Sequence, residues 1–145
     1  MPEPVRNSVT IKASVPTVIE VVSDLENTER WANEAREAKV VDKDEQGRPS
    51  RIRVTLGAIG FTDTSVYAVA YTDNSITLTC VEGKLIKESV ISYTAHDEGD
   101  GRTRLDMTST MIVTVPVPQW GLKRAMRTSA DKNLASVKRD AEASA

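Results

Sequence analysis

Apolar and polar residues alternate over much of this chain, which predicts a protein built mainly of strands. The alternation is clear at the end of Val5–Ala13, as in a half-buried strand. From Ala38 to Val115 the period is again two, and turn-forming residues interrupt it. The interruptions separate strand segments at Lys39–Asp42, Ser50–Ala58, Phe61–Thr72, Ser75–Glu82, Leu85–Ala95 and Thr103–Val115. Because the loops between them are short, we expect an antiparallel meander that the first strand joins from outside.

The residues between the first strand and the meander have helical spacing. Ser14 suits a helix N-cap, and the apolar residues from Val18 to Leu25 recur at intervals of three and four. Asp24 is a second capping residue, which predicts another short helix that carries Trp31. We therefore expect two short, consecutive helices in this segment.

The residues after the meander predict one long helix, from about Pro118 to Glu142. At 1.5 Å per residue such a helix is ~38 Å long. Its apolar side chains fall on one narrow stripe, formed by Leu122, Met126, Ala130, Leu134, Val137 and Ala141. A stripe of this size has to be covered, and we expect the meander to cover it.

These elements predict an α+β fold in which one curved antiparallel sheet of seven strands carries its helices on one side. A curved sheet around a long helix tends to leave an interior gap. The chain has only one Phe, two Trp and three Tyr to fill that gap. We therefore expect an internal cavity, although leucines and valines could also fill the space.

Composition excludes several kinds of site. The chain has 145 residues, which fits one domain over 1–145, and a formal net charge of −2. Its single Cys excludes an internal disulfide and multi-Cys zinc sites, and its single His excludes catalytic metal sites with two or three His. We expect no metal, no cofactor and no nucleic-acid partner, because nucleic-acid surfaces are strongly basic. The sequence shows neither a membrane span nor a signal peptide, which indicates a cytoplasmic protein.

Short motifs occur in a specific order along nearly the whole chain. They are Ile11-x-Ala13, Val18-x-x-Val21-x-x-x-Leu25-Glu26 before Trp31, Asp44–Pro49 (DEQGRP), Asp63-Thr64, Glu82–Lys87 (EGKLIK), Gly101-x-Thr103 and Pro116–Pro118. In this order the chain resembles the START-like, helix-grip superfamily. It is most similar to small SRPBCC proteins of the polyketide cyclase/dehydrase-like group, as found in actinobacteria and mycobacteria. The chain departs from the family at Leu78, where an aromatic residue is frequent, and near Ile91, where a Gly is frequent.

The resemblance implies a hydrophobic pocket between the sheet and the C-terminal helix. Strand parity then selects the side chains that would face it. The candidates for ligand binding are Tyr67, Val69, Tyr71, Leu78, Cys80, Ile91, Tyr93, Met107 and Met111 on strands, with Trp31, Trp120 and Met126 on helices. The methionines suit a flexible apolar ligand and the Tyr hydroxyls could orient it, but ordinary core packing and solvent or backbone contacts are the alternatives.

Few residues in the chain offer catalytic chemistry. His96 lies in HDEGDG, which predicts a solvated hairpin turn, and the inward-facing sets contain no His and no paired carboxylates. Asp63 is a candidate base at a strand start, with a turn or capping role as the alternative. Cys80 is expected to be an inert buried thiol, so we predict no catalytic residue.

Binding or carriage of a lipid- or polyketide-like molecule, without chemistry, is the leading hypothesis. The alternatives are a cyclase or dehydratase acting on a polyketide, and a regulatory or partner-binding module. The sequence does not decide between a monomer and a homodimer. Lys123, Arg124, Arg127, Lys138 and Arg139 lie on the polar side of the C-terminal helix. They indicate a solvated face, or else transient contact with an anionic membrane surface.

Overall fold

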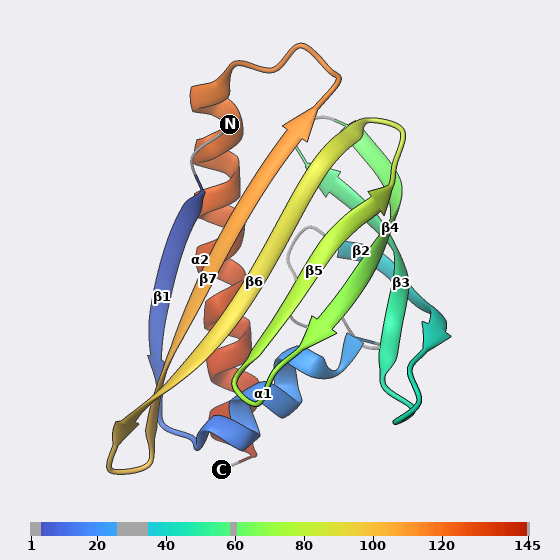
Figure 1. The fold of residues 1–145 in the computed structure, drawn as a ribbon. Coiled ribbons are helices and arrows are strands. Elements are labelled where there is room, and N and C mark those ends of the chain that lie inside the picture. The colour runs from blue at the N-terminus through green and yellow to red at the C-terminus, as the bar shows by residue number, and fades with distance from the viewer. Residues whose placement is uncertain (1–3, 26–34, 59–60, 145) are drawn as a thin grey trace.

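A seven-stranded antiparallel sheet curves around a long C-terminal helix in the computed structural model of the chain, which describes residues 4–25, 35–58 and 61–144 (Figure 1). The strands are β1 (Val5–Ile11), β2 (Ala35–Lys43), β3 (Pro49–Ala58), β4 (Phe61–Tyr71), β5 (Ser75–Glu82), β6 (Ile86–Gly99) and β7 (Arg102–Val113). Their order in the sheet is β1-β7-β6-β5-β4-β3-β2. The predicted meander is confirmed, and β1 joins it from outside by pairing antiparallel with β7.

The hairpin between β6 and β7 is longer than the sequence analysis predicted. The turn lies at Asp100 and Gly101, directly after Gly99 at the end of β6, and the φ angles of Gly99, Asp100 and Gly101 are 82°, 55° and 72°. Glycine adopts such left-handed angles without steric strain, so the two glycines fix the turn there. His96 is consequently a strand residue paired with Arg104, and the prediction that it lies in the turn was wrong.

A short helix, α1 (Val15–Ser23), follows β1. Ser14 caps it by accepting a hydrogen bond from the Thr17 backbone N–H at 3.4 Å, and Val18 and Val22 are fully buried. The second short helix, predicted to carry Trp31, would fall on residues 26–34, which lie outside the described residues.

The long helix is α2 (Gln119–Ala143), within a residue of the predicted bounds. Its predicted stripe is buried at Leu122, Ala130, Leu134, Val137 and Ala141. In Figure 1 the helix runs behind β1 and β7, with its N-terminal end at the top.

Hydrogen bonds fix the C-terminal half of α2 to β1. The Asn7 amide donates to Asp131 at 2.6 Å, and the Lys12 backbone N–H donates to Glu142 at 2.9 Å. Lys138 Nζ donates to the backbone carbonyl of Thr10 at 2.8 Å. This half of the helix is therefore held at both a side chain and the backbone of the edge strand.

Candidate ligand-binding pocket

A pocket lies between the N-terminal half of α2 and the neighbouring strands β6 and β7. Its lining is mostly apolar, with several hydroxyl groups among the apolar side chains. The lining residues are Ser89, Ile91, Met107, Ser109, Thr110, Met111, Leu122, Ala125, Met126, Ser129 and Ala130. The pocket thus lies where the sequence analysis expected one, between the sheet and the C-terminal helix.

Small side chains on both walls explain why a hollow forms here. In the register of β6 and β7, Ser89 pairs with Met111 and Ile91 pairs with Ser109. A short side chain therefore lies next to a long one both along each strand and across the strand pair. Well-packed interiors contain few gaps. A serine is shorter than the large apolar residues usual at an inward position of a sheet, so it leaves space above it.

The helix wall repeats this arrangement. Leu122, Ala125, Met126 and Ser129 recur at intervals of three and four, so they share the face of α2 that covers the pocket. Two of these four side chains are small, which keeps the helix backbone close while leaving room between it and the sheet.

The cavity volume is about 40 Å³. Roughly 10–15 Å³ holds one water molecule, so the pocket in this structure has room for a few waters. A larger guest requires the side chains around it to move. Met107, Met111 and Met126 line the cavity, and unbranched methionine side chains change shape easily.

The structure brings four of the predicted ligand-binding residues together at this pocket: Ile91, Met107, Met111 and Met126. The other strand candidates are Tyr67, Val69, Tyr71, Leu78, Cys80 and Tyr93, which belong to the main core or pack against it. They are not among the lining residues.

Trp120 is not among the residues that line the pocket. Trp120 is 72% exposed at the start of α2, so it is a surface residue there. Trp31 lies outside the described residues.

Tyr71 shows how a tyrosine on the inner face can be satisfied without a ligand. Its hydroxyl donates to the backbone carbonyl of Pro49 at 2.6 Å. The guanidinium of Arg48 lies 4.4 Å from the centre of its ring. Burial raises the pKa of the Tyr71 hydroxyl. The hydroxyl therefore reaches backbone at a strand end, the alternative that the sequence left open.

The hydroxyl residues of the pocket were missed as ligand-binding candidates. Ser89 and Ser109 lie on the inward parity of their strands, and Ser129 lies three residues after Met126 on the helix. Strand parity predicted that Ser89 and Ser109 face inward, but they were not taken as candidates, although a serine at an inward position of a sheet is either paired or exposed to a cavity.

Asp63 is a structural carboxylate, not a base in the pocket. It is buried and accepts hydrogen bonds from the backbone N–H groups of Leu85 and Ile86, each at 3.0 Å, and from the Ser65 hydroxyl at 3.2 Å. Burial alone would raise the pKa of Asp63, but these donors outweigh it and lower the pKa below 3.8. Asp63 therefore has the turn role that the sequence analysis gave as the alternative to a base.

Gly83 allows the turn to pass close to that carboxylate. A Cβ at this position would lie 2.8 Å from the carbonyl oxygen of Ile86 and 2.9 Å from the Ser65 hydroxyl. Only a residue without a side chain fits between them.

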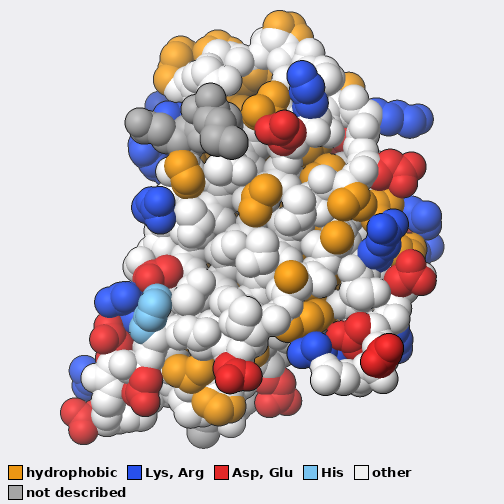
Figure 2. Space-filling view, viewed as in Figure 1, with side chains coloured by type: hydrophobic (Ala, Val, Ile, Leu, Met, Phe, Trp, Pro, Cys, Tyr) orange, Lys and Arg blue, Asp and Glu red, His pale blue; other side chains and the backbone are white. Residues whose placement is uncertain are grey.

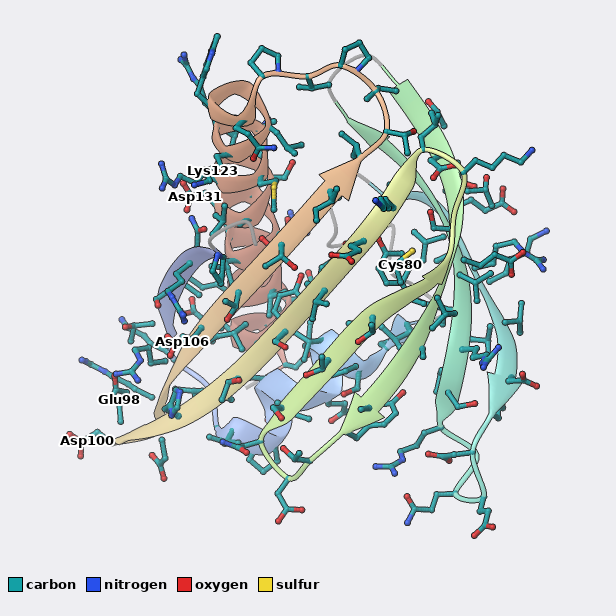
Figure 3. All side chains as sticks on the ribbon, turned by 45° about the horizontal axis from the view of Figure 1, so that its top comes forward. Cys80, Glu98, Asp100, Asp106, Lys123 and Asp131 are labelled. Atoms are coloured by element: carbon teal, nitrogen blue, oxygen red, sulfur yellow. The ribbon has the colours of Figure 1, made fainter. Side chains whose placement is uncertain are left out.

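His96 and Cys80 lie away from the pocket. His96 Nε2 is 3.1 Å from Asp106, whose carboxylate also accepts hydrogen bonds from Ser8 and Arg104, on the surface near the β6–β7 turn (Figure 2). Figure 3 shows Asp106 beside this hairpin and Cys80 on β5, apart from Lys123 and Asp131 on α2. Burial raises the pKa of the Cys80 thiol, which favours its protonated form.

Two further features were searched for in the described part of the chain. No helix there is long and apolar enough to cross a membrane. No group of three or more His, Cys, Asp or Glu there is placed to hold a metal ion.

Residues 3–142 match the family described as polyketide cyclase / dehydrase and lipid transport. No curated protein matches the sequence.

Solved structures share the fold over nearly the whole chain. A START superfamily protein from Mycobacterium smegmatis has a TM-score of 0.88 and 21% identity, and the match covers 99% of this chain and 100% of that one. A protein from Thermus thermophilus has a TM-score of 0.84 and 20% identity, with 98% and 99% covered. The Zhui aromatase/cyclase from Streptomyces sp. R1128 has a TM-score of 0.81 and 15% identity, with 96% and 93% covered.

Proposed function

Because the chain belongs to the polyketide cyclase/dehydrase and lipid transport family, we propose that it binds and carries a hydrophobic small molecule of lipid or polyketide type. The ligand enters the pocket between α2 and strands β6 and β7 and undergoes no chemical change there. The single observation that carries the proposal is the lining of this pocket, in which methionines and small residues surround a hollow without a titratable side chain among the described residues.

Burial of apolar surface supplies the affinity. About 25 cal/mol is gained for each Å² of apolar surface removed from water, so even a modest ring system or acyl chain binds appreciably. Met107, Met111 and Met126 reorient around the guest, because the present cavity of about 40 Å³ is too small for it.

The N-terminal half of α2 is the element that opens. Its C-terminal half is fixed to β1 through Asp131, Lys138 and Glu142, whereas the lining residues Leu122–Ala130 all precede these contacts. A small outward movement about the fixed half widens the pocket without disturbing the sheet.

A cyclase or dehydratase is the runner-up, since the structural neighbours include an aromatase/cyclase. Such chemistry needs a general acid or base within hydrogen-bond reach of the substrate. Asp63 is engaged by backbone N–H groups near the β5–β6 turn, and His96 contacts Asp106 on the surface. These placements favour binding over catalysis.

Native mass spectrometry of the protein purified from its own host tests the proposal. We expect a bound apolar molecule, released on denaturation and identified by its mass. An empty protein that no hydrophobic compound stabilises against heat would contradict the proposal.

A pair of helix variants assigns the bound molecule to this pocket. Ala125→Phe places a ring in the pocket and should abolish the bound mass, whereas Ala135→Phe, at an exposed position of the same helix, should retain it. Equal retention by both variants would place the ligand elsewhere.

A further inference from the structure

The hydroxyl of Ser89 is buried without a hydrogen-bond partner. Ser89 is only 1% exposed, and its Oγ atom accepts from and donates to no described group. Buried hydroxyls are nearly always paired, because leaving one unpaired forfeits the hydrogen bonds it makes with water. An unpaired hydroxyl on a strand therefore needs an explanation.

Several other buried polar side chains of the described structure are paired. Asp63 and Ser65 bond to each other at 3.2 Å, and the Thr103 hydroxyl donates to the backbone carbonyl of Ala13 at 2.7 Å. The difference is position: Ser89 lies in the wall of the pocket, where its neighbours are Met111 across the sheet and Ser109 on the diagonal. Its missing partner therefore belongs to whatever occupies the pocket.

The pocket is also uncharged. The described lining residues contain no Lys, Arg, His, Asp or Glu, and their polar groups are the hydroxyls of Ser89, Ser109, Thr110 and Ser129. An ionised carboxylate would enter this space without a cation to balance its charge, which is strongly unfavourable. A neutral oxygen can exchange a hydrogen bond with a serine and lose little on leaving water.

We propose that Ser89 hydrogen-bonds an uncharged hydroxyl or ketone oxygen of an otherwise apolar ligand, and that the pocket discriminates against ligands with an ionised carboxylate. This inference rests on the proposed function, since it names the class of molecule that the pocket holds. Ser89 determines the ligand's orientation, and the methionines accommodate its apolar body.

Equilibrium dialysis with three matched probes tests the inference: naphthalene, 2-naphthol and 2-naphthoate. We expect Ser89→Ala to weaken the binding of 2-naphthol about three- to tenfold, in the range of a net hydrogen bond, and to leave naphthalene binding unchanged or tighter. The native protein should bind 2-naphthoate more weakly than the other two probes.

Ser92→Ala is the matched control. Ser92 lies on the same strand with opposite parity, where its hydroxyl contacts Thr77 Oγ1 at 2.9 Å. It should not change the affinity for any probe. Thermal unfolding without ligand adds a second readout: Ser89→Ala should leave the midpoint unchanged or raise it, because it removes a buried unpaired group.

The outcomes separate this inference from the proposed function. If 2-naphthol and naphthalene both bind and Ser89→Ala changes neither affinity, the Ser89 hydroxyl does not hydrogen-bond the ligand. The inference then fails, while the carrier function stands. A lower unfolding midpoint for Ser89→Ala with unchanged affinities assigns the hydroxyl a structural role and also overturns the inference. Failure of all three probes to bind the native protein overturns the inference, whereas the proposed function falls only if the protein purified from its host is also empty and no hydrophobic compound stabilises it.

Discussion

The carboxylate of Asp63 stabilises the turn between β5 and β6 by accepting hydrogen bonds from two backbone N–H groups and one hydroxyl. A residue of this type is easily mistaken for a catalytic base, because a carboxylate at a strand start satisfies both roles in a sequence. Its partners decide between them: fixed donors lower the pKa of Asp63, whereas a general base requires a pKa near the working pH.

Replacement of Asp63 should therefore reduce stability in a pH-dependent way. The folded-state pKa lies below 3.8, so the carboxylate contributes stability at pH values above that, and the contribution is lost as the pH falls through the folded pKa. We expect Asp63→Asn to cost about 1–3 kcal/mol at pH 7 and less at a pH low enough to protonate this carboxylate in the folded protein. Urea denaturation at both pH values measures it, with the exposed Asp73→Asn as control. An equal cost at both pH values would contradict this account.

Gly83 predicts a second effect at the same turn. The Cβ of Gly83→Ala would lie 2.8 Å from a backbone carbonyl that cannot move aside, so we expect a loss of about 1–3 kcal/mol. Gly121→Ala is the matched control, because a Cβ there meets nothing within 4 Å and the residue lies in α2. Gly121→Ala should be neutral or stabilising by up to about 1 kcal/mol. Denaturation midpoints that fall equally in both variants would refute the steric argument.

Among the elements, α2 has two halves with different contacts. The C-terminal half contacts β1 through hydrogen bonds and buries Leu134 and Val137, whereas the N-terminal half covers the pocket with a mixture of large and small side chains. The sequence predicted the helix and its stripe, because both follow from a local period. The sequence did not reveal that the two halves of α2 differ, because this depends on which part of the helix is hydrogen-bonded to β1.

Hydrogen exchange should report that division directly. We expect amides of residues 122–130 to exchange faster than those of residues 131–141, and ligand binding to slow the first group selectively. Mass spectrometry of peptides from the two halves, with and without the bound molecule, gives the comparison. Uniform protection along the helix, with or without ligand, would exclude opening at its N-terminal half.

Trp120 lies at the start of the half of α2 that covers the pocket, and it stays a predicted ligand contact. With 72% of it exposed, Trp120→Ala should change stability by less than about 0.5 kcal/mol. If the indole covers the entry of a ligand, the same variant should release the bound molecule faster. Unchanged release rates in stopped-flow measurements would leave Trp120 a surface residue without a role in binding.

For the molecule as a whole, strand period and turn residues were sufficient to predict the architecture. The inward face of β7 followed from the apolar alternation of Leu105, Met107 and Met111. The register of β6 against β7 was not predicted. Gly99 and Gly101 place the turn after His96, so that His96 is a strand residue and pairs with Arg104. The unpaired hydroxyl of Ser89 was also beyond reach, because it is a property of three packed elements and not of any one strand.

The pairing of β1 with β7 also constrains how this protein is made. Val5 lies opposite Ser109, so the contact that adds β1 to the sheet joins the first strand of the chain to the last one. Contacts of such long range are slow to form. On the ribosome, β1 has no partner until β7 has emerged, and α2 emerges later still. The pocket wall is thus the last part of the molecule to be assembled, and a chain stalled before that point exposes the apolar inner face of its sheet to chaperones.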